Sequence, residues 1–278
     1  MRAKNLIFIA VLFIIIGGSL VYKESLNKGA EIKPQALAEA SKLTDDEPTK
    51  EIELDINPME EDEEDDIITS TLDGKIICID PGHQKTGNNN HEPIGPGSSQ
   101  TKPKVSSGTK GIATGKYEYE LNLEVALLLK EALIEKGAIV HMVRESHDVD
   151  ISNSQRAQLA NDVNADLSLR IHADSAGTSS VSGYSILIPG GDFVPGDVIS
   201  KSRDIAEYID ESLGKNISPP SRGLVVRDDL TGFNWTKVPA ILIEMGFMSN
   251  PDEDQLMSTH EFQMNLVNGV IEGLEAYY

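Results

Sequence analysis

The chain has 278 residues, which is enough for one large domain or two small ones. Its formal net charge of −21 argues against nucleic acid as a partner, because an acidic surface repels phosphates. The single cysteine, Cys78, excludes an internal disulfide, and its position in the apolar run 76–79 indicates a buried, unreactive thiol.

The first predicted element is an apolar segment from Leu6 to Tyr22, which follows Arg2 and Lys4. As a helix these 17 residues would extend ~26 Å, slightly less than the ~30 Å hydrocarbon core of a membrane. Residues 1–23 are therefore predicted to be either a short membrane anchor or a signal peptide. The basic residues should stay inside, which places the rest of the chain on the outer face of the membrane, or free outside the cell if the segment is cleaved.

Residues 24–72 are predicted to be an acidic, disordered tether. Between Asp45 and Asp66 the sequence contains 13 acidic residues and one lysine, a charge of −12. Such a dense run of like charge repels itself, and it lacks the apolar periodicity of a packed element. We interpret it as a solvated spacer that leads to a folded domain at residues 73–278.

The folded domain alternates predicted strands with predicted helices. Short apolar runs predict strands at 75–80, 138–143, 166–171, 183–189, 224–226 and 240–244. Helical spacing of apolar residues predicts helices at 118–136, 152–164, 197–213 and 262–276, with Gly137 and Gly214 as helix ends. Residues 84–114 are rich in Gly, Pro, Ser, Asn and Lys and are predicted to form a long loop. The alternation indicates a single α/β domain with a mixed, mainly parallel sheet covered by helices on both faces.

Polar residues stand at the ends of three predicted strands. The first strand leads into a Pro-Gly turn and His83, the strand at 166–171 is followed by His172, and the last strand ends at Glu244. Glu118 begins the helix that follows the long loop. Because sites in such sheets form at the carboxyl ends of the strands, these two histidines and two carboxylates have a reason to converge.

Two imidazoles and one carboxylate are a common zinc-binding set in hydrolases, and they leave one coordination position for water. Zinc lowers the pKa of that water to ~7, and a second carboxylate can take its proton and pass it to the leaving nitrogen. Other interpretations stay open at this point: an exposed turn residue for His83, a hydrogen-bonded core residue for His172, and a helix-dipole charge for Glu118. The other histidines have no comparable context and are predicted to lie in loops or at the surface: His91, His141, His147 and His260.

Four motifs occur in a fixed order: Ile79-Asp80-Pro81-Gly82-His83, Glu118-Tyr119-Glu120-Leu121-Asn122-Leu123, Leu169-Arg170-Ile171-His172-Ala173-Asp174, and the segment from Pro239 to Asn250. With these motifs the sequence resembles the zinc-dependent N-acetylmuramoyl-L-alanine amidases, or type 3 amidases, over residues 75–278. The resemblance implies a twisted mixed sheet with helices on both sides. It also implies hydrolysis of the amide that joins N-acetylmuramic acid to L-alanine of the stem peptide in peptidoglycan.

The resemblance implies that His83, Glu118 and His172 bind Zn²⁺ and that Glu244 is the catalytic acid–base residue. Glu120 is an alternative to Glu118 as the third ligand. Only Glu118 keeps the four-residue spacing to Asn122, which would allow Asn122 to orient the carboxylate from the same helix face. Arg170 is a further candidate, either beside the ligands or substrate or in a structural ion pair.

The sequence departs from many relatives at Gln84, where they have a glycine pair, and in the long loop before Glu118. Both departures concern the shape of the substrate groove. Some members of the family carry an inhibitory helix after the second histidine, but residues 174–197 are predicted to be strand and loop. Two alternative functions remain open, a zinc peptidase of wall peptides and a non-catalytic wall-binding or assembly protein. The expected partners are peptidoglycan and, through the N-terminal segment, a membrane.

Overall fold

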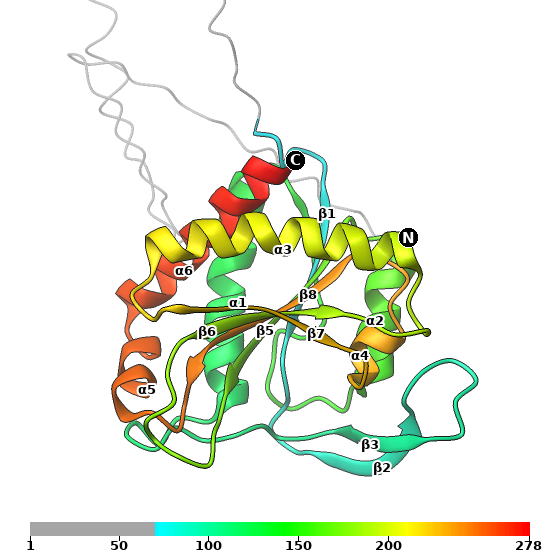
Figure 1. Ribbon diagram of the computed structural model, residues 1–278, viewed down its shortest axis with the longest axis horizontal. Coiled ribbons are helices and arrows are strands. Elements are labelled where there is room, and N and C mark those ends of the chain that lie inside the picture. Colours follow the sequence, from blue (N-terminus) through cyan, green and yellow to red (C-terminus); the bar gives the residue numbers. More distant parts are fainter. Residues whose placement is uncertain (1–69) are drawn as a thin grey trace, which may run out of the picture. The chain divides into compact units, whose positions relative to one another are not determined.

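A six-stranded sheet forms the centre of residues 70–278, the part of the chain that the computed structural model describes (Figure 1). Its strands, in spatial order, are β4 (Ile139–Met142), β1 (Ile76–Pro81), β5 (Leu167–Asp174), β8 (Ala240–Phe247), β6 (Tyr184–Pro189) and β7 (Ser221–Arg227). The first four are parallel to one another, β6 is antiparallel to β8, and β7 is parallel to β6. The predicted mixed, mainly parallel sheet is therefore confirmed.

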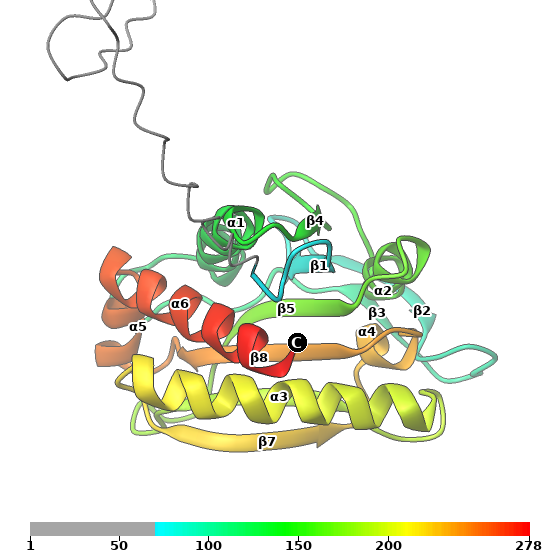
Figure 2. The same cartoon turned by 90° about the horizontal axis from the view of Figure 1, so that it is seen from above.

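Helices cover both faces of this sheet. The main core lies between one face and the helices α1 (Glu118–Glu135), α3 (Gly196–Asn216) and α6 (His260–Tyr277). Helix α6 lies between α1 and α3 and packs against both (Figure 2). The opposite face carries α2 (Asn153–Asp162) and α4 (Thr231–Asn234), each over a smaller apolar cluster. The short helix α5 (Pro251–Met257) precedes α6.

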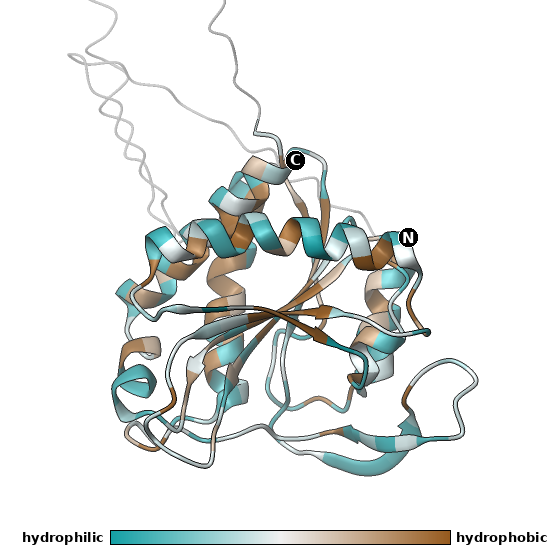
Figure 3. Ribbon diagram, in the orientation of Figure 1, coloured by the Kyte–Doolittle hydropathy of each residue, from teal (hydrophilic) through white to brown (hydrophobic). Residues whose placement is uncertain are grey.

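The central strands are the most hydrophobic part of the fold (Figure 3). Alternation along β5 places Leu169 and Ile171 in the main core, so that Arg170 and His172 point to the opposite face. The same alternation places Ile243 in the main core and Glu244 on the opposite face. The face beneath α2 and α4 therefore collects the polar residues of the central strands.

The predicted loop at 84–114 is only partly correct, because it contains a β-hairpin. Strands β2 (Asn88–Pro93) and β3 (Thr101–Val105) form a separate antiparallel pair. Their polar sequences lack the apolar alternation that predicts strands, and long-range polar contacts fix the hairpin instead. The carboxylate of Glu92 accepts from the backbone N of Ser154 at 3.1 Å, and the indole of Trp235 donates to the carbonyl of Pro93 at 3.0 Å.

The two predicted helix ends have different outcomes. Gly137 has a φ of 83° and directly follows Lys136, the C-cap residue of α1, as expected for a glycine that ends a helix. Gly214 lies inside α3, so its prediction as a helix end is wrong. The helix continues because Leu213 packs into the core and its carbonyl accepts from the backbone N of Ile217. The short helices α4 and α5 were not predicted.

The N-terminal predictions fall almost entirely outside the described residues. Both the predicted anchor or signal peptide at 1–23 and the acidic run of the tether precede Ser70. Leu72, the last residue assigned to the tether, is fully buried in the main core and belongs to the folded part. Among residues 70–278, no helix has the length and apolar character needed to cross a membrane.

Candidate active site

The four residues predicted to carry the chemistry meet at the edge of the sheet where β1, β5 and β8 end. His83 follows β1, Glu118 is the first residue of α1, and His172 and Glu244 lie on β5 and β8. One potential ligand atom each from His83, Glu118 and His172 lies within 4.8 Å of the others. Glu244 pairs in register with His172, and both residues line one cavity beside the cluster. The structure thus brings all four residues together.

His83 has a rare backbone conformation directly after β1. Its φ of 61° lies in the left-handed region, which residues other than glycine seldom adopt. Its Nδ1 is 2.9 Å from the hydroxyl and 3.1 Å from the carbonyl oxygen of Ser106. These contacts direct Nε2 toward Glu118, whose Oε1 is 3.1 Å away. His83 is therefore not a free turn residue, and only 18% of its side chain is exposed.

Glu118 is held by hydrogen bonds to both carboxylate oxygens. Oε2 accepts from the backbone N of Thr109 at 2.9 Å, and Oε1 accepts from the backbone N of Ala173 at 3.2 Å. The side-chain amide of Asn122 donates to Oε1 at 3.3 Å and to the carbonyl of Gly82 at 3.2 Å. The predicted contact of Asn122 with Glu118 is therefore confirmed.

Glu120, the alternative ligand, is occupied elsewhere. Its Oε2 accepts from the backbone N of Tyr117 at 2.9 Å, which closes the N-terminal end of α1 as part of a capping box. The three side chains that form the described metal-binding cluster do not include it. The structure therefore favours Glu118 over Glu120, as the spacing to Asn122 predicted. The histidines at 91, 141, 147 and 260 are also outside this cluster.

Two glycines allow the ligand side chains to approach the backbone. A Cβ atom on Gly82 would lie 2.2 Å from Nε2 of His172, and one on Gly108 would lie 2.6 Å from Oε2 of Glu118. Gly108 also has a φ of 79°, which disfavours any other residue there. The Pro-Gly-His turn therefore needs its glycine because the second histidine packs directly on it.

The electrostatics of the cluster favour a neutral His172 beside an ionised Glu118. Burial lowers the pKa of His172 to about 4, although its hydrogen bond with Glu118 opposes this shift. Burial alone would raise the pKa of Glu118, but hydrogen bonds with His172 and His83 outweigh it and hold the pKa below its usual range. Neutral imidazole and ionised carboxylate are the protonation states that a metal requires of its ligands.

The three side chains fit a divalent metal. Nε2 of His172 is buried and has no hydrogen-bond partner among residues 70–278. Leaving a buried polar atom without a partner is costly, which a bound cation would remedy. Two imidazole nitrogens with one carboxylate oxygen suit zinc, and nitrogen and oxygen donors also suit other first-row metals. The chemistry of the three side chains thus suits them to hold a metal ion.

Glu244 has a different electrostatic environment. Its Oε2 is shielded from solvent and has no hydrogen-bond partner in the described part of the chain. Burial, followed by the negative charges of Glu118 and Asp174, raises the pKa of Glu244 well above its usual value, and Arg170 and Arg227 only partly offset this. A carboxyl group with a raised pKa beside a cavity is typical of a residue that exchanges protons with a substrate.

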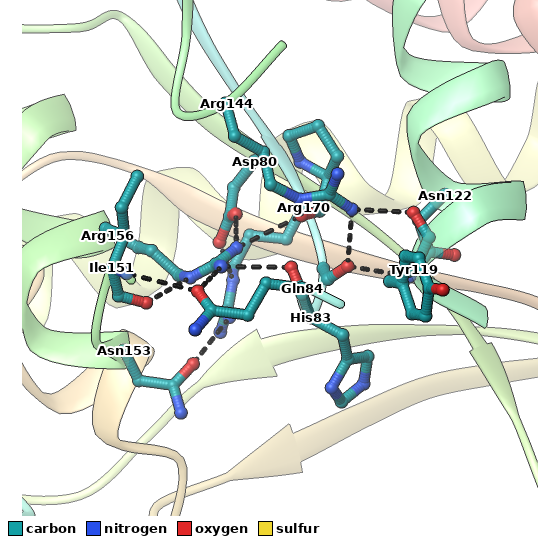
Figure 4. Close-up of polar contacts among 12 residues, drawn as sticks. Asp80, His83, Gln84, Tyr119, Asn122, Arg144, Ile151, Asn153, Arg156 and Arg170 are labelled. Atoms are coloured by element: carbon teal, nitrogen blue, oxygen red, sulfur yellow. Dashed lines mark hydrogen bonds and ion pairs between the residues drawn. The ribbon is translucent and has the colours of Figure 1, made fainter. Parts of the chain in front are cut away.

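A buried ion-pair network lies next to the metal-binding cluster (Figure 4). Asp80 on β1 accepts from Nη1 of Arg156 at 2.6 Å and from Nε of Arg170 at 2.8 Å. Burial alone would raise the pKa of Asp80, but Arg156 and Arg170 outweigh it and hold the pKa below its usual range. Arg170, predicted to be either a site residue or an ion-pair residue, makes this ion pair and also lines the cavity.

Two arginines hold the turn that carries His83 (Figure 4). Arg144 donates to the carbonyls of Pro81 and Gly82 at 2.9 and 3.0 Å. Arg156 donates to the carbonyls of Pro81 and His83 at 3.1 and 3.0 Å. A guanidinium group can do this because its donors are fixed in a planar fork. The three successive carbonyls of the turn are thus all bound by buried cations.

Sequence reasoning missed both of these arginines. Arg144 follows β4 and Arg156 lies on α2, two elements to which no site residue was assigned. The spacing of Arg156 to Ala160, four residues later, does place it on the inward face of that helix. A cation on an inward face was therefore the signal that could have revealed it.

Gln84, the departure from the glycine pair of many relatives, is fully buried. Its Oε1 accepts from the backbone N of Ile151 at 3.1 Å and from Nη2 of Arg156 at 3.2 Å. Its Nε2 donates to the carbonyl of Thr86 at 2.9 Å. Gln84 therefore ties the histidine turn to the segment that precedes α2, and it does not project into the cavity.

The segment between β5 and α3 contains β6 and turns, with no helix in the described residues 175–195. This agrees with the prediction that no inhibitory helix follows the second histidine. The cavity beside the cluster has a volume of ≈ 220 Å³. It is lined by His83, Asn153, Arg170, His172, Leu187, Arg227, Leu230, Thr231, Gly232, Leu242 and Glu244. Apolar and charged side chains therefore share its walls.

The family profile of N-acetylmuramoyl-L-alanine amidases matches residues 77–276. This match spans the central sheet and the four residues that meet at its edge. The chain belongs to the N-acetylmuramoyl-L-alanine amidase family. It is a peptidoglycan hydrolase, and the bond it cleaves joins N-acetylmuramic acid to L-alanine of the stem peptide.

Curated relatives are also named as amidases. The germination-specific N-acetylmuramoyl-L-alanine amidase of Bacillus subtilis is 28% identical over 229 residues, which cover 74% of this chain and 81% of that protein. The probable cell wall amidase LytH of Staphylococcus aureus is 28% identical over 207 residues, which cover 74% of this chain. The match spans only 60% of the length of the staphylococcal protein.

Solved structures of amidases share the fold. The amidase Ami1 of Mycobacterium smegmatis superposes with a TM-score of 0.67 at 25% identity, covering 75% of this chain and 98% of that one. Ami1 of Mycobacterium abscessus gives a TM-score of 0.66 at 27% identity, covering 74% and 99% of the two chains. The predicted fold class, an α/β domain with helices on both sides of a twisted sheet, is therefore confirmed.

Proposed function

We propose that this amidase is zinc-dependent, with His83, Glu118 and His172 as the ligands and Glu244 as the acid–base residue. The observation that carries the proposal is the convergence of two imidazoles and one carboxylate within 4.8 Å, with a second carboxylate beside them. The chemistry that zinc supplies when bound is Lewis acidity, which polarises a carbonyl and makes water more acidic. The remaining steps fall to the side chains of the chain itself.

Glu244 performs the proton transfers. At the start of the reaction its ionised carboxylate accepts a proton from the attacking water. Burial leaves the negative charge of the Glu244 carboxylate poorly solvated, so it accepts a proton more readily than an exposed carboxylate does. It then donates the same proton to the nitrogen of L-alanine, which leaves as a neutral amine. One residue thus serves both halves of the hydrolysis.

Arg144, Arg156 and Asn122 orient the ligands. The two arginines fix the backbone of the His83 turn, and Asn122 fixes the carboxylate of Glu118. Such contacts behind metal ligands hold the ligand atoms in place before the metal arrives. Restraint of this kind reduces the entropy lost on metal binding, which raises the affinity for the metal.

We also propose that residues 1–23 attach the protein to a membrane or direct its export, and that the acidic residues between this segment and Ser70 are a tether to the catalytic domain, which includes Leu72. The apolar segment Leu6–Tyr22 behind basic residues supports export, and the tether would give the domain reach into the cell wall. Fractionation should find the full chain with membranes, and an external protease should release the domain. A mature chain beginning near residue 20 would instead indicate a cleaved signal peptide.

The test of the enzymatic proposal is mass spectrometry of the products formed by the full-length protein from purified peptidoglycan. Stem peptides with a free L-alanine amino group should accumulate, a chelator should stop their formation, and zinc should restore it. Cuts within the peptides would identify a wall peptidase, and no product in any sample would identify a non-catalytic wall-binding protein. Activity that survives complete metal removal would overturn the metal-dependent mechanism.

A further inference from the structure

Arg227 lies on the cavity wall opposite the metal-binding cluster, and no role in the proposed mechanism requires it. The cavity takes side chains from β5, β8, β6 and β7, which are adjacent in that order. His172 stands on the first of these strands and Arg227 on the last. The cavity therefore runs across the sheet from the metal-binding cluster to a guanidinium group.

Arg227 and Glu244 emerge from the same face of the sheet. Glu244 is two positions after Leu242 on β8. Leu242 pairs in register with Leu187 of β6. Leu187 pairs in turn with Val225 of β7, two residues before Arg227. Because register partners and residues two apart share a face, Arg227 points to the side of the active site. The charge of Glu244 also helps to raise the pKa of Arg227, after the larger effect of Asp229.

The guanidinium of Arg227 is fixed in place but keeps one free donor group. Nε and Nη2 bind the two carboxylate oxygens of Asp229 at 2.8 and 3.1 Å. Nη1 has no hydrogen-bond partner among residues 70–278. Lys102 from the hairpin also binds Asp229, at 3.2 Å. Two cations thus share the carboxylate of Asp229, and the negative charges of Glu244 and Asp174 also act on Arg227.

A positive group at this place suits an anionic part of the substrate near the cleaved bond. The stem peptide continues from L-alanine to a D-glutamate that is linked through its γ-carboxyl, so its α-carboxyl is free unless it is amidated. Adjacent strands are ~4.8 Å apart, which puts the backbones of β5 and β7 ~14 Å apart, and the Arg227 side chain shortens that distance. A dipeptide spans up to ~7 Å, a length that fits the remaining gap.

We propose that this cavity binds the first two residues of the stem peptide and that Arg227 binds the α-carboxylate of the second. Leu187, Leu230 and Leu242 supply the apolar wall for the peptide between the cluster and Arg227. The proposal rests on the amidase function, and it assigns the enzyme a preference for stem peptides whose D-glutamate is not amidated. Asp229 and Lys102 act as positioning residues that hold the guanidinium.

The test uses two substrates that differ in a single group, MurNAc-L-Ala-D-Glu and MurNAc-L-Ala-D-isoglutamine. The zinc-loaded, full-length protein should cleave the first with a kcat/KM about tenfold to a hundredfold higher, as expected for a charge-assisted hydrogen bond. Arg227→Gln should remove most of this preference, and Arg227→Lys should keep part of it because the charge remains without the fork. The ratio of the two rates does not depend on how much of a variant is folded.

Arg222→Gln is the matched control, because Arg222 stands on the same strand but does not line the cavity. It should keep the full preference. Equal cleavage of the two substrates by the native protein would overturn the proposal, and so would a preference that survives Arg227→Gln.

If neither substrate is cleaved, the proposed amidase function is wrong. A binding measurement then tests the proposed subsite separately. Calorimetry then compares L-Ala-D-Glu with L-Ala-D-isoglutamine on the same full-length protein. Tighter binding of the carboxylate form that is lost in Arg227→Gln supports the subsite, and equal binding overturns it.

Discussion

His172 and Glu244 are register partners on the adjacent parallel strands β5 and β8. Their side chains therefore leave the same face of the sheet next to each other. One is a proposed metal ligand and the other the proposed acid–base residue. Because both stand on strands at the centre of the sheet, rigid backbone sets their separation, and catalysis does not depend on a loop closing to bring them together.

Gly82→Ala should weaken metal binding. The added Cβ would lie 2.2 Å from Nε2 of His172, so the imidazole ring would have to move. We expect at least a ~10-fold loss of zinc affinity, the lower end of the effect of displacing groups that orient ligands. Competition with a chelator on the full-length protein measures it. Gly177→Ala is the control, because its Cβ would meet nothing within 4 Å, and equal affinity in both variants would refute the close contact.

Arg156→Lys separates positive charge from the hydrogen-bonding fork. Lysine keeps a partner for Asp80 but cannot also reach the carbonyls of Pro81 and His83. The His83 turn should loosen, and zinc affinity should fall by about 10- to 100-fold. The exposed Arg222→Lys should leave affinity unchanged. An unchanged affinity in Arg156→Lys would mean that Arg144 alone suffices to hold the turn.

The strand ends show what a sequence can reveal about such a site. His83, His172 and Glu244 were predicted to converge because the carboxyl ends of parallel strands lie at one edge of the sheet. Apolar runs and turn residues in the sequence mark where those strands end. The partners of Arg144 and Arg156 were not predictable in this way. Their partners in the histidine turn are backbone carbonyls 62 to 75 residues away in the chain, and no local pattern records which carbonyls a guanidinium will meet.

The hairpin of β2 and β3 escaped prediction for a related reason. Its strands carry asparagine, lysine and proline in place of alternating apolar residues. They are fixed by the contact of Glu92 with α2 and by the contact of Pro93 with Trp235 at the end of α4, and both partners come later in the chain. Gly214 illustrates the opposite error, since a local signal for a helix end was overridden by the packing of Leu213 and by Ile217. Local rules thus fail where tertiary contacts decide.

Asp80→Asn should destabilise the metal-free protein by about 3–5 kcal/mol at pH 7, because two buried arginines lose their counter-charge. The effect should depend on pH in a defined direction. The pKa of Asp80 is held below its unfolded value of 3.8, so its stabilisation is complete above that value and is lost as the pH falls toward the folded pKa. Urea unfolding should give equal differences between wild type and variant at pH 7 and 5, and a smaller difference at pH 3.

Asp192→Asn is the control for this comparison, because Asp192 is exposed. It should change the free energy of unfolding by no more than ~0.5 kcal/mol at each pH. A difference between wild type and Asp80→Asn that grew as the pH fell would contradict the assigned direction of the pKa shift.

Glu244→Gln and Glu118→Gln should separate catalysis from metal binding. Glutamine at position 244 keeps the size and one acceptor oxygen but cannot accept a proton at neutral pH. Zinc should stay bound, while turnover should fall by ~10²–10⁴-fold through the loss of acid–base catalysis alone. At position 118 a neutral amide is a poor ligand, so zinc affinity and activity should fall together.

Zinc content and amidase rate, measured on both variants of the full-length protein, give four values that distinguish the two roles. The removal of a buried carboxyl with a raised pKa should not unfold the protein, because that group is already costly to ionise at neutral pH. Loss of zinc in Glu244→Gln together with retained zinc but no activity in Glu118→Gln would reverse the assignment. Near-normal rates in both variants would remove both residues from the site, since neither a metal ligand nor the sole acid–base group can be replaced by an amide without a large loss of rate.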